Sequence, residues 1–184
     1  SWEAAVRNNL ICTFHVSVPG GIFPPPPVRG NYYPETQTNN GLTYQNQIPS
    51  IVFGGVFEKF PDLRMVFVEG GFAWLPSVMY TMDTHWRNLR REVPWVKRPP
   101  SEVVREHMWF GTQPLIEPER PEDEEHVLQI IEMIGTDKIL FASDYPHWEF
   151  DAPHQALAKF PQDVRNKILY ENAVKLYGFD NPMK

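Results

Sequence analysis

The sequence lacks several features that would assign it to a known class of protein. It has a single cysteine, Cys12, so it cannot contain an internal disulfide. That thiol lies in an apolar run, which fits a buried thiol in a reducing compartment. No apolar run approaches the roughly 20 residues that span a bilayer, and Ser1-Trp2-Glu3 does not resemble the start of a secretory signal. We therefore expect a cytoplasmic chain with no membrane partner.

Positive charge is also scarce. The chain has 17 Lys and Arg against 23 Asp and Glu, a net charge of −6, and no basic stripe. Nucleic-acid binding depends largely on basic contacts to phosphates, so a nucleic-acid partner is not expected. No glycine-rich phosphate loop follows an apolar run, which disfavours a nucleotide-binding, doubly wound α/β domain.

Hydrophobic residues are plentiful. They make up 42% of the 184 residues, and 14% are aromatic. This length and composition are typical of one folded domain, and we expect residues 1–184 to form it.

The main pattern is a short apolar run, a turn and a longer amphipathic stretch, repeated four times. This order predicts βα units with parallel strands. The four expected strands are Leu10–Ser17, Arg64–Glu69, His107–Thr112 and Lys138–Ser143.

Helical periodicity fills most of the intervals between the runs. The expected helices are Ile48–Phe60, Trp74–Arg91, Ser101–Glu106 with Ser101 as N-cap, Glu122–Ile134 ending at Gly135, Gln162–Tyr170 and Glu171–Tyr177. The segment Val18–Gln47 is rich in Pro, Gly, Asn, Thr and Tyr and is expected to contain no helix. A loop of this length usually serves binding, so we expect it to cover the functional site.

Polar or ionisable residues stand where each predicted strand ends: His15, Glu69, Gln113 and Asp144. The carboxyl ends of parallel strands share one edge, so these side chains should converge there. Histidine with carboxylates suits Zn, Mn or non-haem Fe, and the spacing does not choose between them.

Each residue also has a purely structural interpretation. His15 can be a hydrogen-bonded core histidine, Glu69 can cap the helix that follows it, and Asp144 can begin a turn. The residues alone leave these alternatives open.

Longer stretches resemble a known family. Gly54–Arg64 with Val66–Gly71, Phe141–His147, and Lys167–Ala173 with Leu176–Gly178 are similar to segments of the amidohydrolase-related family. That family includes aminocarboxymuconate-semialdehyde decarboxylase, resorcylate-type decarboxylases and hydrolases. The resemblance implies the C-terminal half, about strands 5–8, of a TIM-type (β/α)8 barrel.

The resemblance also implies roles for individual residues. His15 matches a metal ligand at the end of the fifth strand, and Asp144 matches the metal-binding aspartate of the eighth, which orients the catalytic water. Glu69 stands where the sixth strand often ends in histidine, so we treat it as a further ligand, and adjacency to Asp144 suggests that His147 binds substrate. The implied enzyme is a hydrolase or non-oxidative decarboxylase with one divalent ion and a small carboxylated or cyclic substrate.

The chain departs from the family in having no counterpart of the first four strands or of the metal motif on the first. We therefore expect a fragment of a longer enzyme that by itself binds metal poorly. Its two open sheet edges are compatible with a homo-oligomer. The alternative is a catalytically inactive half-barrel that acts as a binding or dimerisation module.

Overall fold

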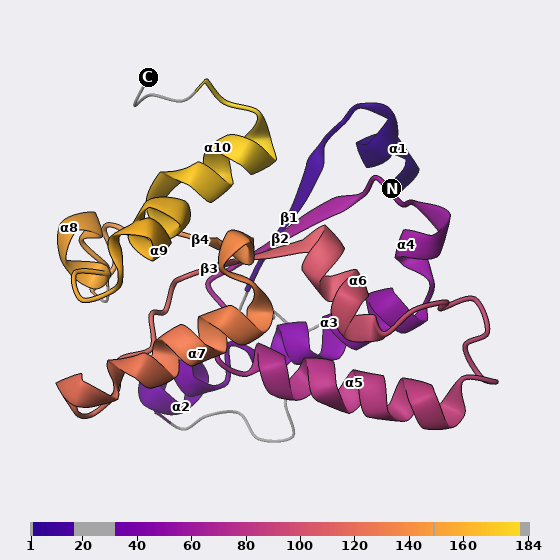
Figure 1. Ribbon diagram of the computed structural model, residues 1–184, viewed down its shortest axis with the longest axis horizontal. Helices are drawn as coiled ribbons and strands as arrows, with labels where there is room; N and C mark the ends of the chain where they lie inside the picture. The colour runs from indigo at the N-terminus through magenta and orange to yellow at the C-terminus, as the bar shows by residue number, and fades with distance from the viewer. Residues whose placement is uncertain (1, 17–31, 149, 181–184) are drawn as a thin grey trace.

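The computed structural model describes residues 2–16, 32–148 and 150–180 (Figure 1). Its strands are β1 (Ile11–His15), β2 (Arg64–Val68), β3 (Met108–Gly111) and β4 (Ile139–Leu140). Its α-helices are α1 (Trp2–Arg7), α2 (Tyr33–Thr38), α3 (Leu42–Phe53), α4 (Val56–Lys59), α5 (Leu75–Leu89), α6 (Pro100–His107), α7 (Glu124–Ile134), α8 (Pro153–Ala156), α9 (Gln162–Asn166) and α10 (Asn172–Tyr177). Two 3₁₀ turns, η1 (Pro121–Asp123) and η2 (Thr136–Lys138), and one π-helical turn, η3 (Lys167–Glu171), complete the described elements.

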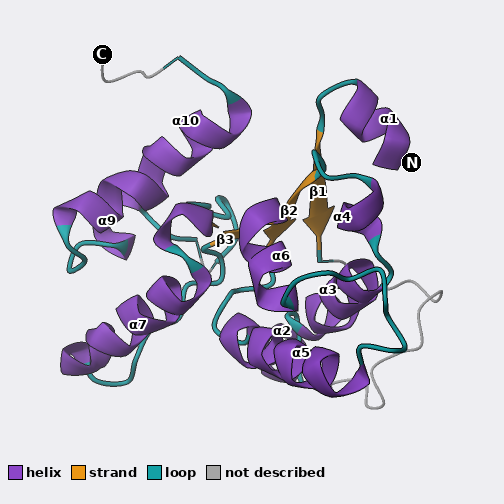
Figure 2. Ribbon diagram, turned by 45° about the vertical axis from the view of Figure 1, so that its right-hand side comes forward, coloured by secondary structure: helices purple, strands orange, loops and turns teal. Residues whose placement is uncertain are grey.

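The four strands form one sheet in the order β1-β2-β3-β4, and every neighbouring pair is parallel. The register aligns Phe14 with Phe67, Phe67 with Phe110, and Phe110 with Ile139. Figure 2 shows β1 and β2 side by side with helices around them. The prediction of four parallel βα units is confirmed.

One face of the sheet carries most of the core. Met65, Phe67, Met108, Phe110 and Ile139 are all buried there. Helices α3, α5, α6 and α7 bring their apolar residues to this same cluster. The rings of Phe14, Phe67 and Phe110 stack with centroids 4.9 and 5.4 Å apart, so an aromatic row crosses three strands.

The other face has a smaller apolar cluster. Val66 of β2 and Leu140 of β4 pack with Leu176 of α10, which lies on the opposite side of the sheet from α3 and α5 (Figure 1). On the same face of β1, Thr13, the register partner of Val66, is exposed. Cys12 is only half-buried, so the expectation of a buried thiol is met in part.

The expectation of a helix-free segment over Val18–Gln47 is wrong where it can be examined. Residues 17–31 lie outside the described part, but α2 and the first half of α3 fall within the segment. Pro34 stands in the first turn of α2, where its missing N–H is tolerated. Helix α3 buries Tyr44, Ile48 and Val52 on one side, and this tertiary packing outweighs the weak helix propensity of its Asn and Thr residues.

Two further boundaries differ from the predictions. The helix expected over Ile48–Phe60 is divided at Gly54 and Gly55, and Gly55 has a left-handed φ of 70°. Ser101 lies inside α6 rather than at its N-cap. Its amide and hydroxyl both donate to the Asp83 carboxylate, at 2.9 and 2.7 Å, so a side chain from α5 caps α6.

The end of the chain closes the sheet at β4. The Phe141 amide donates to the Ile168 carbonyl at 2.9 Å, so η3 covers the outer edge of β4 and the strand is shorter than predicted. Asn172 is buried, and its side-chain amide donates to the backbone carbonyls of Thr136 and Ile139, both at 2.8 Å. These bonds tie α10 to the strand that leads to Asp144.

Candidate active site

The ends of β1 and β2 bring His15 and Glu69 together. The His15 Nε2 lies 2.9 Å from a Glu69 carboxylate oxygen. The Nδ1 of His15 contacts the Val16 carbonyl, which favours the tautomer with its proton on Nδ1 and leaves Nε2 available. His15 is therefore not a core histidine: its side chain is 60% exposed.

The surroundings of His15 shift its pKa upward. The contact with the Val16 carbonyl raises the pKa of His15 above its usual value, although partial burial opposes this, and the carboxylates of Glu69 and Asp144 raise it further. The effect of Asp144 is the smallest of these.

Glu69 and Asp144 share an uncommon backbone conformation. Their φ angles are 60° and 57°, in the left-handed region that few residues other than glycine adopt. Such strain concentrates at functional sites. At both strand ends the chain turns sharply where the acidic side chain stands.

Asp144 pairs with His147 in the loop after β4. The His147 Nδ1 lies 2.8 Å from an Asp144 carboxylate oxygen. The Asp144 side chain is only 10% exposed, whereas that of His147 is 62% exposed. Exposed aromatic side chains surround this loop, and Trp148 contacts Tyr33 of α2 with ring centroids 6.4 Å apart.

The third strand contributes no accessible side chain to this edge. Gln113 is buried, and its backbone carbonyl accepts a hydrogen bond from the Gly71 amide at 3.3 Å. Thr112 is also buried and bonds to the Ala142 backbone. Both residues join neighbouring strand ends through these bonds, and the expected convergence is seen for His15 and Glu69.

The donor chemistry at this edge fits a divalent ion. One imidazole nitrogen with carboxylate oxygens is a set that Zn, Mn and Fe accept. Within residues 2–16, 32–148 and 150–180, however, no three His, Cys, Asp or Glu side chains stand close enough together to hold an ion. His15–Glu69 and Asp144–His147 are two separate pairs.

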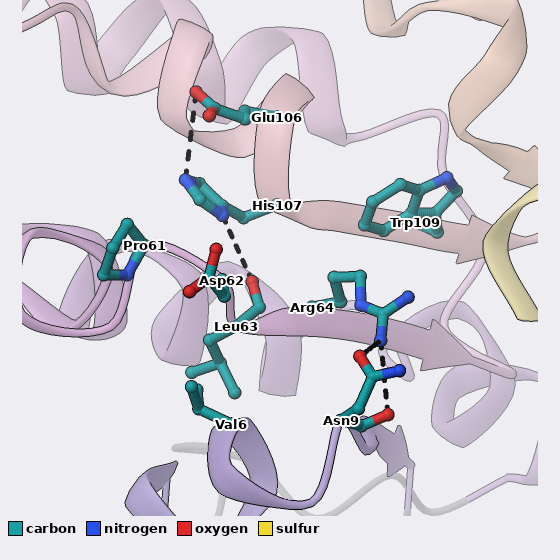
Figure 3. Close-up of a pocket in the computed structure, with 9 residues that line it drawn as sticks. All are labelled: Val6, Asn9, Pro61, Asp62, Leu63, Arg64, Glu106, His107 and Trp109. Carbon is teal, nitrogen blue, oxygen red and sulfur yellow. Dashed lines mark hydrogen bonds and ion pairs between the residues drawn. The ribbon is translucent and has the colours of Figure 1, made fainter.

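Two cavities lie elsewhere. One, of about 460 Å³, is at the amino ends of β2 and β3 and includes Arg64, Glu106 and His107 (Figure 3). Two of its polar side chains are partnered within the fold: Arg64 bonds to Asn9 and to the Leu176 carbonyl, and the His107 Nδ1 lies 3.1 Å from the Leu63 carbonyl. The second, of about 450 Å³, lies between the segment after β3 and α8. Neither is the common cleft expected between His15, Glu69 and Asp144.

Comparison with known families identifies the fold's relatives. An amidohydrolase family model matches residues 1–179. The chain belongs to this amidohydrolase family. A curated member from Dictyostelium discoideum, 2-amino-3-carboxymuconate-6-semialdehyde decarboxylase, is 27% identical over 139 residues, which is 72% of this chain and 36% of that protein.

Solved structures of amidohydrolases share the fold. One from Mycobacterium avium subsp. paratuberculosis is 23% identical with a TM-score of 0.72, over 95% of this chain and 44% of that one. A dihydroxybenzoic acid decarboxylase from Polaromonas sp., solved with manganese and 2-nitroresorcinol, is 20% identical with a TM-score of 0.66, over 99% of this chain and 54% of that one. This chain thus spans about a third to a half of the length of these amidohydrolases.

Among the described residues, no helix is long and apolar enough to cross a bilayer.

The sequence prediction missed one residue of this edge. Tyr44 of α3 is buried, and its hydroxyl contacts the last backbone carbonyls before His15 and Glu69. Its segment had been predicted as irregular loop, and both of its partners are at least 24 residues away in the sequence. No local pattern marks a contact of this kind.

Proposed function

We propose that this chain supplies about strands 5–8 of an amidohydrolase barrel, as a single domain, and part of its divalent metal site. His15, Glu69 and Asp144 are the ligands that it contributes. The observation that carries this proposal is the 2.9 Å contact between the His15 Nε2 and the Glu69 carboxylate at the carboxyl edge of the sheet. Asp144, held at the same edge in a strained conformation, supports it.

The proposed reaction is non-oxidative decarboxylation, or hydrolysis, of a small carboxylated aromatic or cyclic substrate. Decarboxylase relatives and the aromatic side chains near Asp144 favour the first. A bound Mn, Zn or Fe ion would supply positive charge to hold a substrate carboxylate or phenolate and would acidify water.

The residues of the chain have distinct roles in this proposal. Asp144 accepts and returns the proton at the reacting centre. His147, held by Asp144 through Nδ1, presents Nε2 to the substrate as a hydrogen-bonding group. Within the described part of the segment Val18–Gln47, Tyr33 lies against Trp148, which supports a covering role for this part of the chain; residues 18–31 lie outside the described structure.

A second candidate is a catalytically inactive half-barrel that acts as a binding or dimerisation module. The absence of a three-ligand group among the described residues favours it, because a catalytic ion normally has about three protein ligands. The exposure of His15 favours it as well.

Metal analysis distinguishes the two candidates. We expect the purified 184-residue chain to retain little metal after dialysis, and a complete enzyme containing this segment to retain about one ion per chain. A tightly held stoichiometric ion in the 184-residue chain would contradict the incomplete ligand set. Absence of metal from the complete enzyme as well would favour the inactive module.

The Asp144→Asn variant of the complete enzyme tests the catalytic role. It keeps the shape of the side chain and removes the proton acceptor, so turnover should fall about 10²–10⁴-fold with the fold intact. The matched control is Asp137→Asn, because Asp137 is 55% exposed and pairs only with Lys138 in the described structure. Normal turnover in Asp144→Asn would remove Asp144 from the mechanism.

A further inference from the structure

Tyr44 joins the ends of β1 and β2 beneath the candidate site. Its side chain is buried, with only 1% exposure. Its hydroxyl oxygen lies 2.8 Å from the Phe14 carbonyl and 2.7 Å from the Val68 carbonyl. These two carbonyls belong to the residues immediately before His15 and Glu69.

A single hydroxyl proton serves both carbonyls. Tyrosine has one O–H, so it donates to one of the two oxygens at a time or is shared between them. Either way, the hydroxyl keeps the two carbonyls within reach of one atom. Because each peptide group is planar, fixing the Phe14 and Val68 carbonyls also fixes the backbone that carries His15 and Glu69.

The Tyr44 ring also packs against the turn at Glu69 and Gly70. A methyl group on Gly70 would lie 2.3 Å from two carbons of this ring, so the ring packs directly against the backbone that follows Glu69. The edge of the ring also meets Phe67 of β2, with centroids 5.0 Å apart. The Tyr44 ring thus packs against both sides of the turn at Glu69, the strand before it and the glycine after it.

A second aromatic residue, Trp74 at the N-cap of α5, also bonds to this turn. The Trp74 indole donates to the Gly70 carbonyl at 2.8 Å. Gly41, at the start of the helix that carries Tyr44, lies so close to this indole that a Cβ there would stand 2.6 Å from it. Tyr44, Trp74 and the two glycines therefore form one packed support under Glu69.

We infer that Tyr44 is a positioning residue for the His15–Glu69 pair, setting the distance between the imidazole and the carboxylate. Its relevance to metal binding rests on the function proposed above. Tyr44 is buried, and in the described structure its hydroxyl bonds to two backbone carbonyls, so it acts through His15 and Glu69 and not by contact with a ligand.

The test is Tyr44→Phe in the 184-residue chain, which keeps the ring and removes the hydroxyl. The matched control is Tyr80→Phe, since the Tyr80 side chain is exposed on α5. With ¹⁵N-labelled histidine, NMR at one pH reports the hydrogen bonding of the His15 nitrogens, with His15→Asn assigning the signals and Glu69→Gln giving the signature of the broken pair. We expect Tyr44→Phe to move the His15 signals toward that signature and Tyr80→Phe to leave them in place.

A titration of the complete enzyme with Mn²⁺ forms the second arm. Outer-shell partners of metal ligands change metal affinity by about 10–100-fold, so we expect Tyr44→Phe to weaken Mn²⁺ binding at least about 10-fold relative to Tyr80→Phe. If the complete enzyme with the native sequence shows no Mn²⁺ binding, that result counts against the proposed function, while the NMR arm still decides the positioning role.

Unchanged His15 signals in a folded Tyr44→Phe chain would overturn the inference. Should that variant fail to fold, Trp74→Phe replaces it, because it removes the indole hydrogen bond to Gly70 from the same support and keeps an aromatic ring there. His15 signals that stay in place in Trp74→Phe would then overturn the inference equally.

Discussion

Replacing Asn172 with alanine should release the C-terminal helix from the sheet. The buried Asn172 amide donates to the Thr136 and Ile139 carbonyls, both at 2.8 Å. Thr136 is half-buried, so water can replace that bond and its loss costs about 1 kcal/mol. Ile139 is fully buried, and leaving its carbonyl without this donor costs about 1–3 kcal/mol. We expect Asn172→Ala to lower the free energy of unfolding by about 2–4 kcal/mol.

Thermal and urea unfolding followed by circular dichroism measure this loss. For a domain of this size about 1 kcal/mol corresponds to about 2–4 °C, so the midpoint should fall by about 4–16 °C. Asn172→Asp, which replaces the donating amide with an acceptor, should lose at least as much. The control, Asn88→Ala on the exposed side of α5, should stay within about 0.5 kcal/mol. If Asn172→Ala were no less stable than this control, the reasoning about the two hydrogen bonds would be refuted.

Two other predictions concern the core. Burial lowers the pKa of His107, so the His107 side chain binds a proton near pH 6.5 in the unfolded chain and only at lower pH in the folded chain. The free energy of unfolding should therefore fall as the pH drops below about 6.5. Urea titrations at several pH values should show that this decrease is smaller in His107→Gln. Identical pH dependence in both chains would contradict it. A methyl group on Gly70 would stand 2.3 Å from the buried Tyr44 ring, so Gly70→Ala should cost about 3 kcal/mol or more in urea unfolding. Gly111→Ala, whose nearest neighbours would be 3.6 Å away, should cost far less, and equal losses would show that the Tyr44 ring can move.

The strands and their ends could be predicted because apolar runs and the turns after them are local features. The runs ending near His15, Glu69, Gln113 and Asp144 all became parallel strands or their continuations. The parallel order then brings His15 beside Glu69, since β1 and β2 are neighbours in the sheet. Fold class and the candidate edge were therefore accessible from the sequence.

Features that depend on distant residues could not be predicted. Helix α3 forms in a segment of unfavourable composition because Tyr44, Ile48 and Val52 are buried by other elements. The N-terminal turn of α6 is capped by Asp83, 18 residues before Ser101. The same reason hid Tyr44, whose two partners belong to different strands.

The two edges of the sheet are unequal, and this gives any further growth of the sheet a direction. η3 bonds to the outer side of β4, whereas β1 is the edge strand at the other end. An added strand would therefore join beside β1, about 4.8 Å away in the hydrogen-bonding direction. If it ran parallel and in register with β1, which is the edge strand among the described residues, its last residue would lie next to His15. The register at this edge therefore determines which residue of an added strand meets the imidazole.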